Sequence, residues 1–164
     1  MRIEDLQLLN IVKDFLIRNL SKDYVDNVYL YSPAADAKDP LIVVNVLSAG
    51  EERDETDGGN EGTTQVEINV LTTNYDYGTP ELQKSIERLY VSVAEVRRVI
   101  ETEDYLDYVR EKLEEAETGL GATVRIDDIS RTYGIVPTGR GQYIRCAITT
   151  PFIIHQQKGV LTNE

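Results

Sequence analysis

The sequence predicts an α+β fold, in which helices pack on one face of an antiparallel sheet. Three observations lead to it: a helical apolar repeat near the N-terminus, two strand-like runs on either side of a polar segment, and a long helical stripe followed by further strands. The expected order is α-β-β-β-α(α)-β-β. A chain of 164 residues fits one hydrophobic core, so we expect a single domain over residues 1–164.

The N-terminal elements follow from apolar spacing. Residues 3–20 are expected to form a helix, because apolar side chains recur there at steps of three and four. Residues 28–31 predict a short strand that ends before Pro33. Residues 41–47 are almost wholly apolar and rich in β-branched side chains, which is typical of a buried strand. Residues 64–71 alternate between apolar and polar side chains, which predicts a strand with one buried face.

The segment between these last two strands has a different composition. Residues 48–62 hold six acids, four glycines and one arginine, with no large apolar side chain. Such a segment contributes nothing to a core. We therefore expect 48–62 to be a mobile, acidic, glycine-rich loop that joins the two strands as a hairpin.

The C-terminal half begins with a strong helix start, because Thr79 can cap a helix and Pro80 suits its first position. A helical stripe continues to residue 100, and a second acidic stretch covers 101–117, so either one bent helix or two helices are expected. Two strands follow, over 123–129 and 143–154, with a turn at 137–141 between them. Residues 131–133 either continue the first of these strands or leave it. Residues 156–164 are expected to be a frayed tail.

Composition restricts the classes of function. The net charge of −12, from 29 acids and 17 bases, disfavours general binding to nucleic acid phosphates. A single cysteine, Cys146, forms no internal disulfide. The N-terminus carries charges within its apolar residues, unlike a signal peptide, and no uncharged apolar run reaches about 18 residues. We therefore expect no membrane segment and a protein of the cytoplasm, or of a virus that assembles there.

Residues suited to catalysis are few, so we expect no enzyme. The only histidine, His155, lies at the end of the last predicted strand without a nucleophile signature nearby, and Cys146 is expected to be a small core residue. Asp54, Asp57 and Glu61 lack the spacing of a calcium loop. We expect neither a cofactor nor a dedicated metal site. The acidic stretch 101–117 is either a solvated helix face or a surface for a basic partner.

Tyrosines form another open case. The chain has ten tyrosines and no tryptophan, and several lie near the predicted strand ends. A tyrosine there is either core filler with its hydroxyl at the surface or an anchor of a protein interface. This group comprises Tyr24, Tyr29, Tyr31, Tyr75 and Tyr77.

The element order and several stretches resemble the tail terminator (tail-completion) proteins of long-tailed bacteriophages. The stretches are Pro40-Leu41-Ile42-Val43-Val44, the acidic loop, Thr64-Gln65-Val66-Glu67-Ile68-Asn69-Val70, Tyr75-Asp76-Tyr77-Gly78, the helix from Leu82 to Leu89, and the closing strands. The likeness covers most of residues 3–155 and rests on pattern and order. The acidic stretch 101–117 is longer than in small members of that family.

The resemblance implies a ring, usually of six copies, that caps the tail tube, stops its polymerisation and joins it to the head connector. Implied partners are other copies of the chain, the tail-tube protein and the head-completion or connector protein. DNA would pass through the ring without specific binding, helped by acidic walls. The implied location is the neck of the virion tail, after assembly in the host cytoplasm.

Candidate contacts to neighbouring copies or to the tube follow from this resemblance. They lie in the acidic loop and at two later arginines: Glu51, Glu52, Arg53, Asp54, Glu55, Arg131 and Arg140. The three arginines are expected to pair with acids of a neighbouring copy, and each has an alternative as an ordinary solvated arginine.

Three other functions stay open at this stage. One is a head-completion or connector protein of the same virion neck. Another, of a different class, is an acidic DNA-mimic inhibitor, although the acids concentrate in one loop and one helix instead of covering one continuous face. The third is a metal-dependent hydrolase, which a single histidine and the lack of ligand spacing disfavour.

Overall fold

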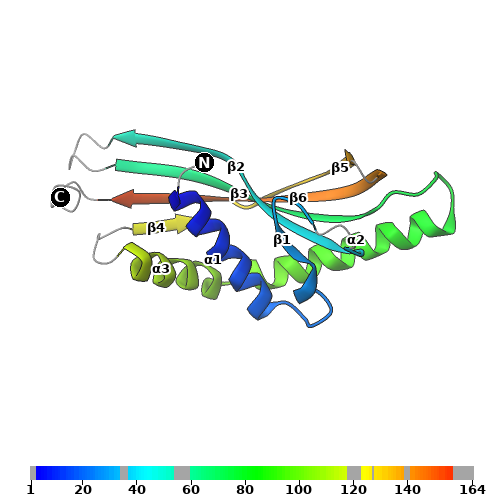
Figure 1. The fold of residues 1–164 in the computed structure, drawn as a ribbon, viewed down its shortest axis with the longest axis horizontal. Coiled ribbons are helices and arrows are strands. Elements are labelled where there is room, and N and C mark those ends of the chain that lie inside the picture. The colour runs from blue at the N-terminus through cyan, green and yellow to red at the C-terminus, as the bar shows by residue number, and fades with distance from the viewer. Residues whose placement is uncertain are drawn as a thin grey trace.

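The computed structural model describes residues 3–33, 37–53, 60–117, 123–126, 128–138 and 141–156. It confirms the α+β class, with three α-helices and a six-stranded sheet in the described part (Figure 1). The elements in chain order are α1 (Ile3–Asn19), a 3-10 turn (Val25–Asn27), β1 (Val28–Leu30), β2 (Leu41–Arg53), β3 (Asn60–Thr73), α2 (Pro80–Ile100), α3 (Glu103–Glu117), β4 (Thr123–Ile126), β5 (Ser130–Thr138) and β6 (Gly141–Gln156).

The sheet is mixed, so the expectation of a purely antiparallel sheet was wrong. Its strand order is β1-β2-β3-β6-β4, and β5 also pairs with β6. β1 runs parallel to β2, with Val28 opposite Ile42, whereas all other pairs are antiparallel. Because β1 and β2 run in the same direction, both strands start at the same end of the sheet.

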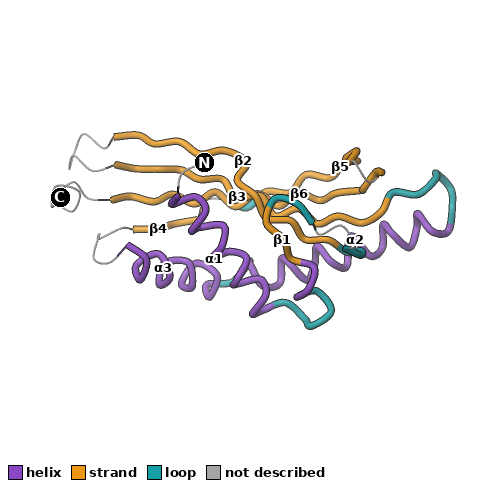
Figure 2. Tube along the Cα trace, viewed as in Figure 1, coloured by secondary structure: helices purple, strands orange, loops and turns teal. Residues whose placement is uncertain are grey.

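The helices and one face of the sheet share a single core (Figure 2). Alternate strand residues such as Val44, Ile68 and Ile148 are fully buried against apolar residues of α1, α2 and α3. The opposite face has a smaller apolar cluster of Leu41, Val43 and Leu71. Beside it, Asn69 Nδ2 donates to Glu67 Oε1 at 2.7 Å. The fold is therefore two layers, with the larger apolar face of the sheet turned toward the helices.

The predicted loop over 48–62 is largely strand. Residues 48–53 continue β2 and pair with 60–65 of β3, with Arg53 opposite Asn60. Backbone hydrogen bonds hold this part of the hairpin, and they need no apolar side chains. A register shift between Val46 and Ser48 marks where the apolar part of β2 ends. Residues 54–59 and 157–164, parts of the predicted loop and tail, lie outside the described residues, and Gln156 still belongs to β6.

The helical region resolves the alternative left open above in favour of two helices. Thr79 caps α2, accepting a hydrogen bond from Leu82 N at 3.2 Å, and α2 ends at Ile100. α3 starts at Glu103 and runs end to end with α2 below the sheet in the view of Figure 1, where α1 crosses obliquely. None of the described helices is long and apolar enough to cross a membrane.

Candidate assembly surface

β4 and β5 lie one after the other along the same side of β6. β4 pairs with residues 152–155 of β6, and β5 pairs with residues 141–149. Together they form one edge of the sheet. The separate strand β5 adds an element to the expected order, in which residues 131–133 either continued the preceding strand or left it.

The β4 half of this edge is covered. Val124 is 4% exposed and packs in the main core, as does the fully buried Phe152 opposite Ile126. Phe152 meets the ring of Tyr105 from α3 at 5.8 Å between centroids. Arg110 of α3 closes the region with a hydrogen bond from Nε to the carbonyl of Val124, at 2.9 Å.

The β5 half is open. Tyr133 stacks on Tyr90 of α2, with ring centroids 5.3 Å apart, yet both side chains remain exposed. Ile135 is 61% exposed and, two residues along β5 from Tyr133, lies on the same face. Ile86 is one helical turn before Tyr90 and is also exposed. We name Ile86, Tyr90, Tyr133 and Ile135 the α2–β5 cluster.

The strand register supports placing these four residues together. Ile135 is opposite Ile144, which is opposite Thr72, and the hydroxyl of Thr72 donates to the carbonyl of Ser85 at 3.0 Å. Ile135 therefore lies at the level of the α2 turn that contains Ile86. The cluster thus consists of four exposed apolar side chains on a helix and an edge strand, linked by the Tyr90–Tyr133 stack, and exposed apolar residues at a sheet edge are a common setting for protein contacts.

Arginines border the α2–β5 cluster. Arg131 lies two residues before Tyr133 on β5 and therefore on the same face of the strand. Burial raises the pKa of the Cys146 thiol, whereas its hydrogen bond with Tyr133 and the positive charges of Arg131 and Arg97 act in the opposite direction. Arg97 already pairs with Glu101, because its Nε donates to Glu101 Oε1 at 2.8 Å. This hydrogen bond raises the pKa of Arg97. Arg131 is exposed. From residue 130 to residue 156 the chain contains three arginines and no acid.

A turn rich in tyrosine lies at the same end of the molecule. Tyr77 is 99% exposed and Tyr75 is also exposed, with Asp76 between them. We name Tyr75–Tyr77 the tyrosine turn. This exposure excludes core filler, one of the two alternatives left open for Tyr75 and Tyr77. An open depression of about 610 Å³ lies between Tyr77 and the first turns of α2, as far as Ile86.

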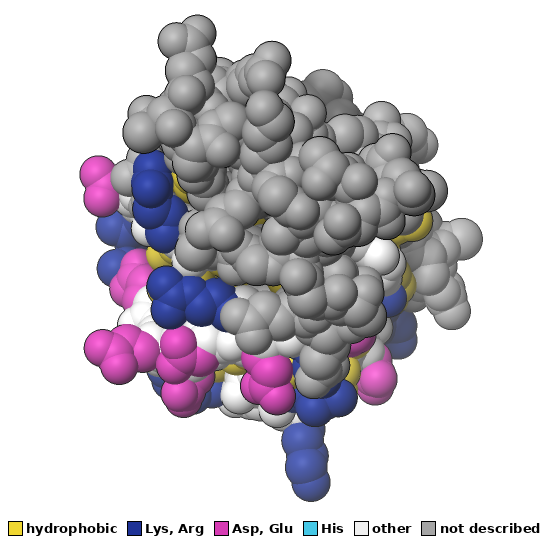
Figure 3. Space-filling model, turned by 90° about the vertical axis from the view of Figure 1, so that its left-hand side faces the viewer, with side chains coloured by type: hydrophobic (Ala, Val, Ile, Leu, Met, Phe, Trp, Pro, Cys, Tyr) yellow, Lys and Arg dark blue, Asp and Glu magenta, His cyan; other side chains and the backbone are white. Residues whose placement is uncertain are grey.

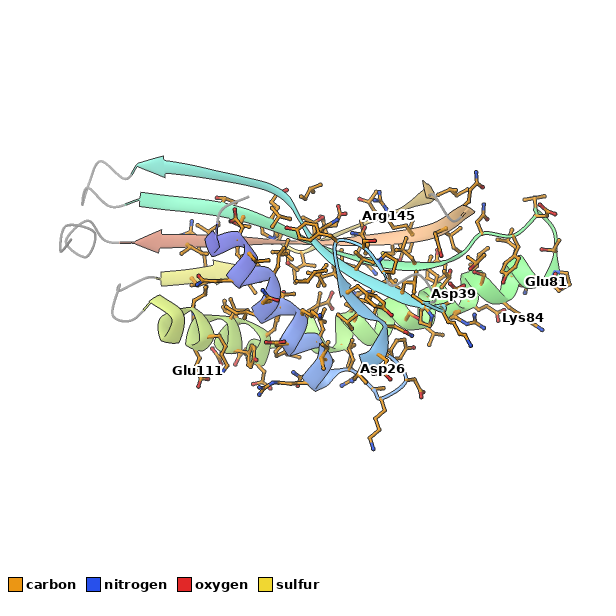
Figure 4. All side chains as sticks on the ribbon, viewed as in Figure 1. Asp26, Asp39, Glu81, Lys84, Glu111 and Arg145 are labelled. Carbon is orange, nitrogen blue, oxygen red and sulfur yellow. The ribbon has the colours of Figure 1, made fainter. Side chains whose placement is uncertain are left out.

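Acids gather on the outer face of α3. Asp104, Asp107 and Glu111 are all exposed and, at steps of three and four, form one stripe. Figure 4 shows Glu111 pointing away from the sheet on α3, at the opposite end of the helical layer from Glu81 and Lys84 of α2. Figure 3 views the molecule from the side on which α3 lies in Figure 1. Side chains of both charge signs lie on the described part of this side. The stripe therefore fits the solvated face considered from the sequence.

The structure places the sequence-predicted contact residues in two separate regions. Glu51, Glu52 and Arg53 form the end of β2, where Arg53 is opposite Asn60, next to Gln156 of β6. Arg131 lies opposite Ile148, eight residues back along β6, and is exposed. Asp54, Glu55 and Arg140 lie outside the described residues. Arg131 is thus not brought to the acidic hairpin of its own chain.

Sequence reasoning missed the apolar residues of the α2–β5 cluster. Tyr90 lies off the apolar stripe of its helix, and Ile135 stood next to an expected turn. A weak signal existed, since Arg131, Tyr133 and Ile135 alternate with Thr132 and Gly134.

Within the described ranges, no three side chains of histidine, cysteine, aspartate or glutamate are grouped as metal ligands would be. No protein-family model matches the chain, and no curated protein matches it either.

Proposed function

We propose that this chain is a structural virion protein that forms a ring, caps the bacteriophage tail tube, stops its polymerisation and joins it to the head connector. The observation that carries the proposal is the exposed α2–β5 cluster on an edge strand. A stacked pair of tyrosines with two isoleucines at a sheet edge is suited to contact another protein.

The stretches that carry the resemblance to tail terminators are neighbours in this fold. Pro40–Val44 leads into β2, and Thr64–Val70 is its partner in β3, with Ile42 opposite Val70. Tyr75–Gly78 forms the turn from β3 into α2. These three stretches, which are part of a likeness over most of residues 3–155, thus follow one another through β2, β3 and the start of α2.

The mechanism rests on shape and repeated contacts. A contact between two different surfaces of neighbouring copies repeats by rotation and closes as a ring when the rotation returns to its start. The end of the β2–β3 hairpin, with Glu51 and Arg53, is the proposed contact to the tube, and the acidic chain lets DNA slide through. The ring works in the tail neck after assembly in the host cytoplasm, with no bond made or broken.

The test is a tube-growth assay. A tail-tube protein, sought among the genes next to this one, is purified and polymerised with and without the chain, and tube lengths and ends are imaged by electron microscopy. We expect a ring at one tube end and no further growth from that end. Unchanged growth and bare ends would overturn the proposal, as would a gene neighbourhood of metabolic enzymes in place of tail-tube and tape-measure genes.

A further inference from the structure

The α2–β5 cluster has the composition of an interface centre. Tyrosine and arginine dominate the residues that contribute most to protein binding, because they combine large apolar area with polar groups. Here two tyrosines and two isoleucines form the centre, and the exposed Arg131 lies at the border. The outer side of β5 forms no strand pair in the described residues, so the surface is accessible from the edge.

A matching occupant presents apolar rings together with a carboxylate. The apolar part would cover the cluster, and the carboxylate would meet Arg131 in a geometry that favours charge-assisted hydrogen bonds. The exposed large apolar residues elsewhere in the described chain include Leu6, Tyr31, Leu47 and Val91. Among the residues whose exposure the structure describes, only the tyrosine turn places two exposed rings on both sides of an exposed acid.

The backbone holds the tyrosine turn in a defined shape. At its start, Asn74 N donates to the carbonyl of Gln142 at 3.0 Å. At its end, the hydroxyl of Thr79 donates to the carbonyl of Asp76 at 2.8 Å. Gly78 has a φ of 81°, a conformation that side chains disfavour. A preformed turn loses little conformational entropy on binding, which favours its use as an anchor.

The tyrosine turn does not cover the α2–β5 cluster of its own chain. Tyr77 is 99% exposed, so its ring packs against no surface of its own chain. A fully exposed tyrosine ring offers about 150–250 Å² for burial in a contact.

We propose that the tyrosine turn of one copy docks on the α2–β5 cluster of a second copy, with Asp76 facing Arg131. As proposed, the contact is heterologous: the turn of each copy meets the cluster of the next copy, and the contact repeats from copy to copy instead of closing as a two-fold pair. The inference rests on the proposed function for its occupant, a second copy of this chain.

Two exposed positions allow a test that leaves the fold intact. Tyr77→Ser removes the anchor from the turn, and Ile135→Asp places a charge in the cluster. Leu47→Asp is the matched control, because Leu47 is a strand residue that is 54% exposed and belongs to neither surface. Circular dichroism and thermal unfolding check that all three variants fold.

Association is measured by light scattering after size exclusion and by analytical ultracentrifugation. We expect the wild type and Leu47→Asp to associate alike, and Tyr77→Ser and Ile135→Asp each to bind about tenfold or more weakly. A mixture of the two weakened variants forms one-to-one pairs, because one intact turn and one intact cluster remain. Asp76→Arg and Arg131→Asp each weaken association, and the double variant restores it, since the charges are then exchanged.

The inference is overturned if the wild type stays monomeric, if Tyr77→Ser and Ile135→Asp assemble like the wild type, or if Leu47→Asp is equally weakened. The tube-growth assay separates this result from the proposed function. Copies that associate through the turn without affecting tube growth would leave the inference standing and overturn the function. If Tyr77→Ser and Ile135→Asp assemble like the wild type and still cap tubes, the inference is overturned and the proposed function stands.

Discussion

β4 and β5 share one side of β6, yet their surroundings differ. Above β4, α3 supplies Tyr105 against Phe152, and Arg110 caps the carbonyl of Val124. At β5, the only ring contact described with α2 is the stack of Tyr90 on Tyr133, and the described side chains from Ser130 to Ile135 remain exposed. The covered half stabilises the monomer, whereas the open half leaves apolar area for a contact with another molecule. Measurements of stability and of association should therefore separate the two halves.

The largest effect is expected in the covered half. Phe152→Ala removes a fully buried ring that packs against Tyr105, so we expect a loss of about 3–5 kcal/mol in the free energy of unfolding. Urea denaturation followed by circular dichroism measures it. A loss below about 1 kcal/mol would show that this half is not a core, and would remove the contrast with β5.

A smaller, pH-dependent effect is expected where α2 is tied to α1. Glu95 accepts hydrogen bonds from Arg98 Nε at 2.6 Å and from the backbone and hydroxyl of Ser21. These bonds, led by that of Arg98, lower the pKa of Glu95 from 4.5 to about 2. A lowered folded-state pKa gives stability that is present above pH 4.5 and is lost as the pH falls toward 2.

Glu95→Gln should accordingly lower the free energy of unfolding by about 2 kcal/mol at pH 7. Denaturation curves at several pH values between 7 and 3 should show the difference from the wild type shrinking as the pH falls. A difference that is constant with pH would mean that the carboxylate charge at this anchor contributes nothing.

Arg110→Ala tests the cap on β4 with a smaller change. Arg110 is about half exposed, so we expect a loss of about 1 kcal/mol from its hydrogen bond to Val124. Hydrogen exchange followed by mass spectrometry should show faster exchange in residues 123–126 and no change in residues 130–138. Equal acceleration in both strands would mean that the edge opens as one unit.

The smallest effect is expected in the open half. Tyr133→Ala removes a ring that is 43% exposed, so we expect about 0.5 kcal/mol or less from monomer stability. The same urea denaturation, at a protein concentration that keeps the chain monomeric, measures it beside Phe152→Ala. A loss above about 2 kcal/mol would show that β5 belongs to the core as much as β4 does.

The sequence predicted most elements of the fold, because their side chains follow the period of the element. The helix of residues 3–20 and the strand of residues 64–71 appear in the structure as α1 and as part of β3. Two features were not predictable in this way. Pairing of Ser48–Arg53 with β3 depends on backbone hydrogen bonds, and the apolar pattern of a short strand such as β1 does not indicate whether it pairs in parallel or antiparallel.

The candidate surface was harder to predict than the fold. Arg131 stood out as a base in a polar stretch, and the structure places it beside the cluster. Tyr90 did not, because it lies off the apolar stripe of its helix, and Ile135 gave only the weak signal of alternation with Tyr133. Their proximity comes from the register of β5 on β6, which joins segments about forty residues apart, so no local pattern in the sequence indicates it.

The position of β6 bears on how the chain folds. β6 follows all other described elements in the chain, yet it lies between β3 and the β4–β5 edge, and its Thr150 hydroxyl bonds the carbonyl of Val66, 84 positions earlier. During synthesis, the edge of β3 that pairs with β6 therefore stays unpaired until β6 has left the ribosome. Pairing between such distant segments slows folding and leaves a strand edge exposed in the meantime.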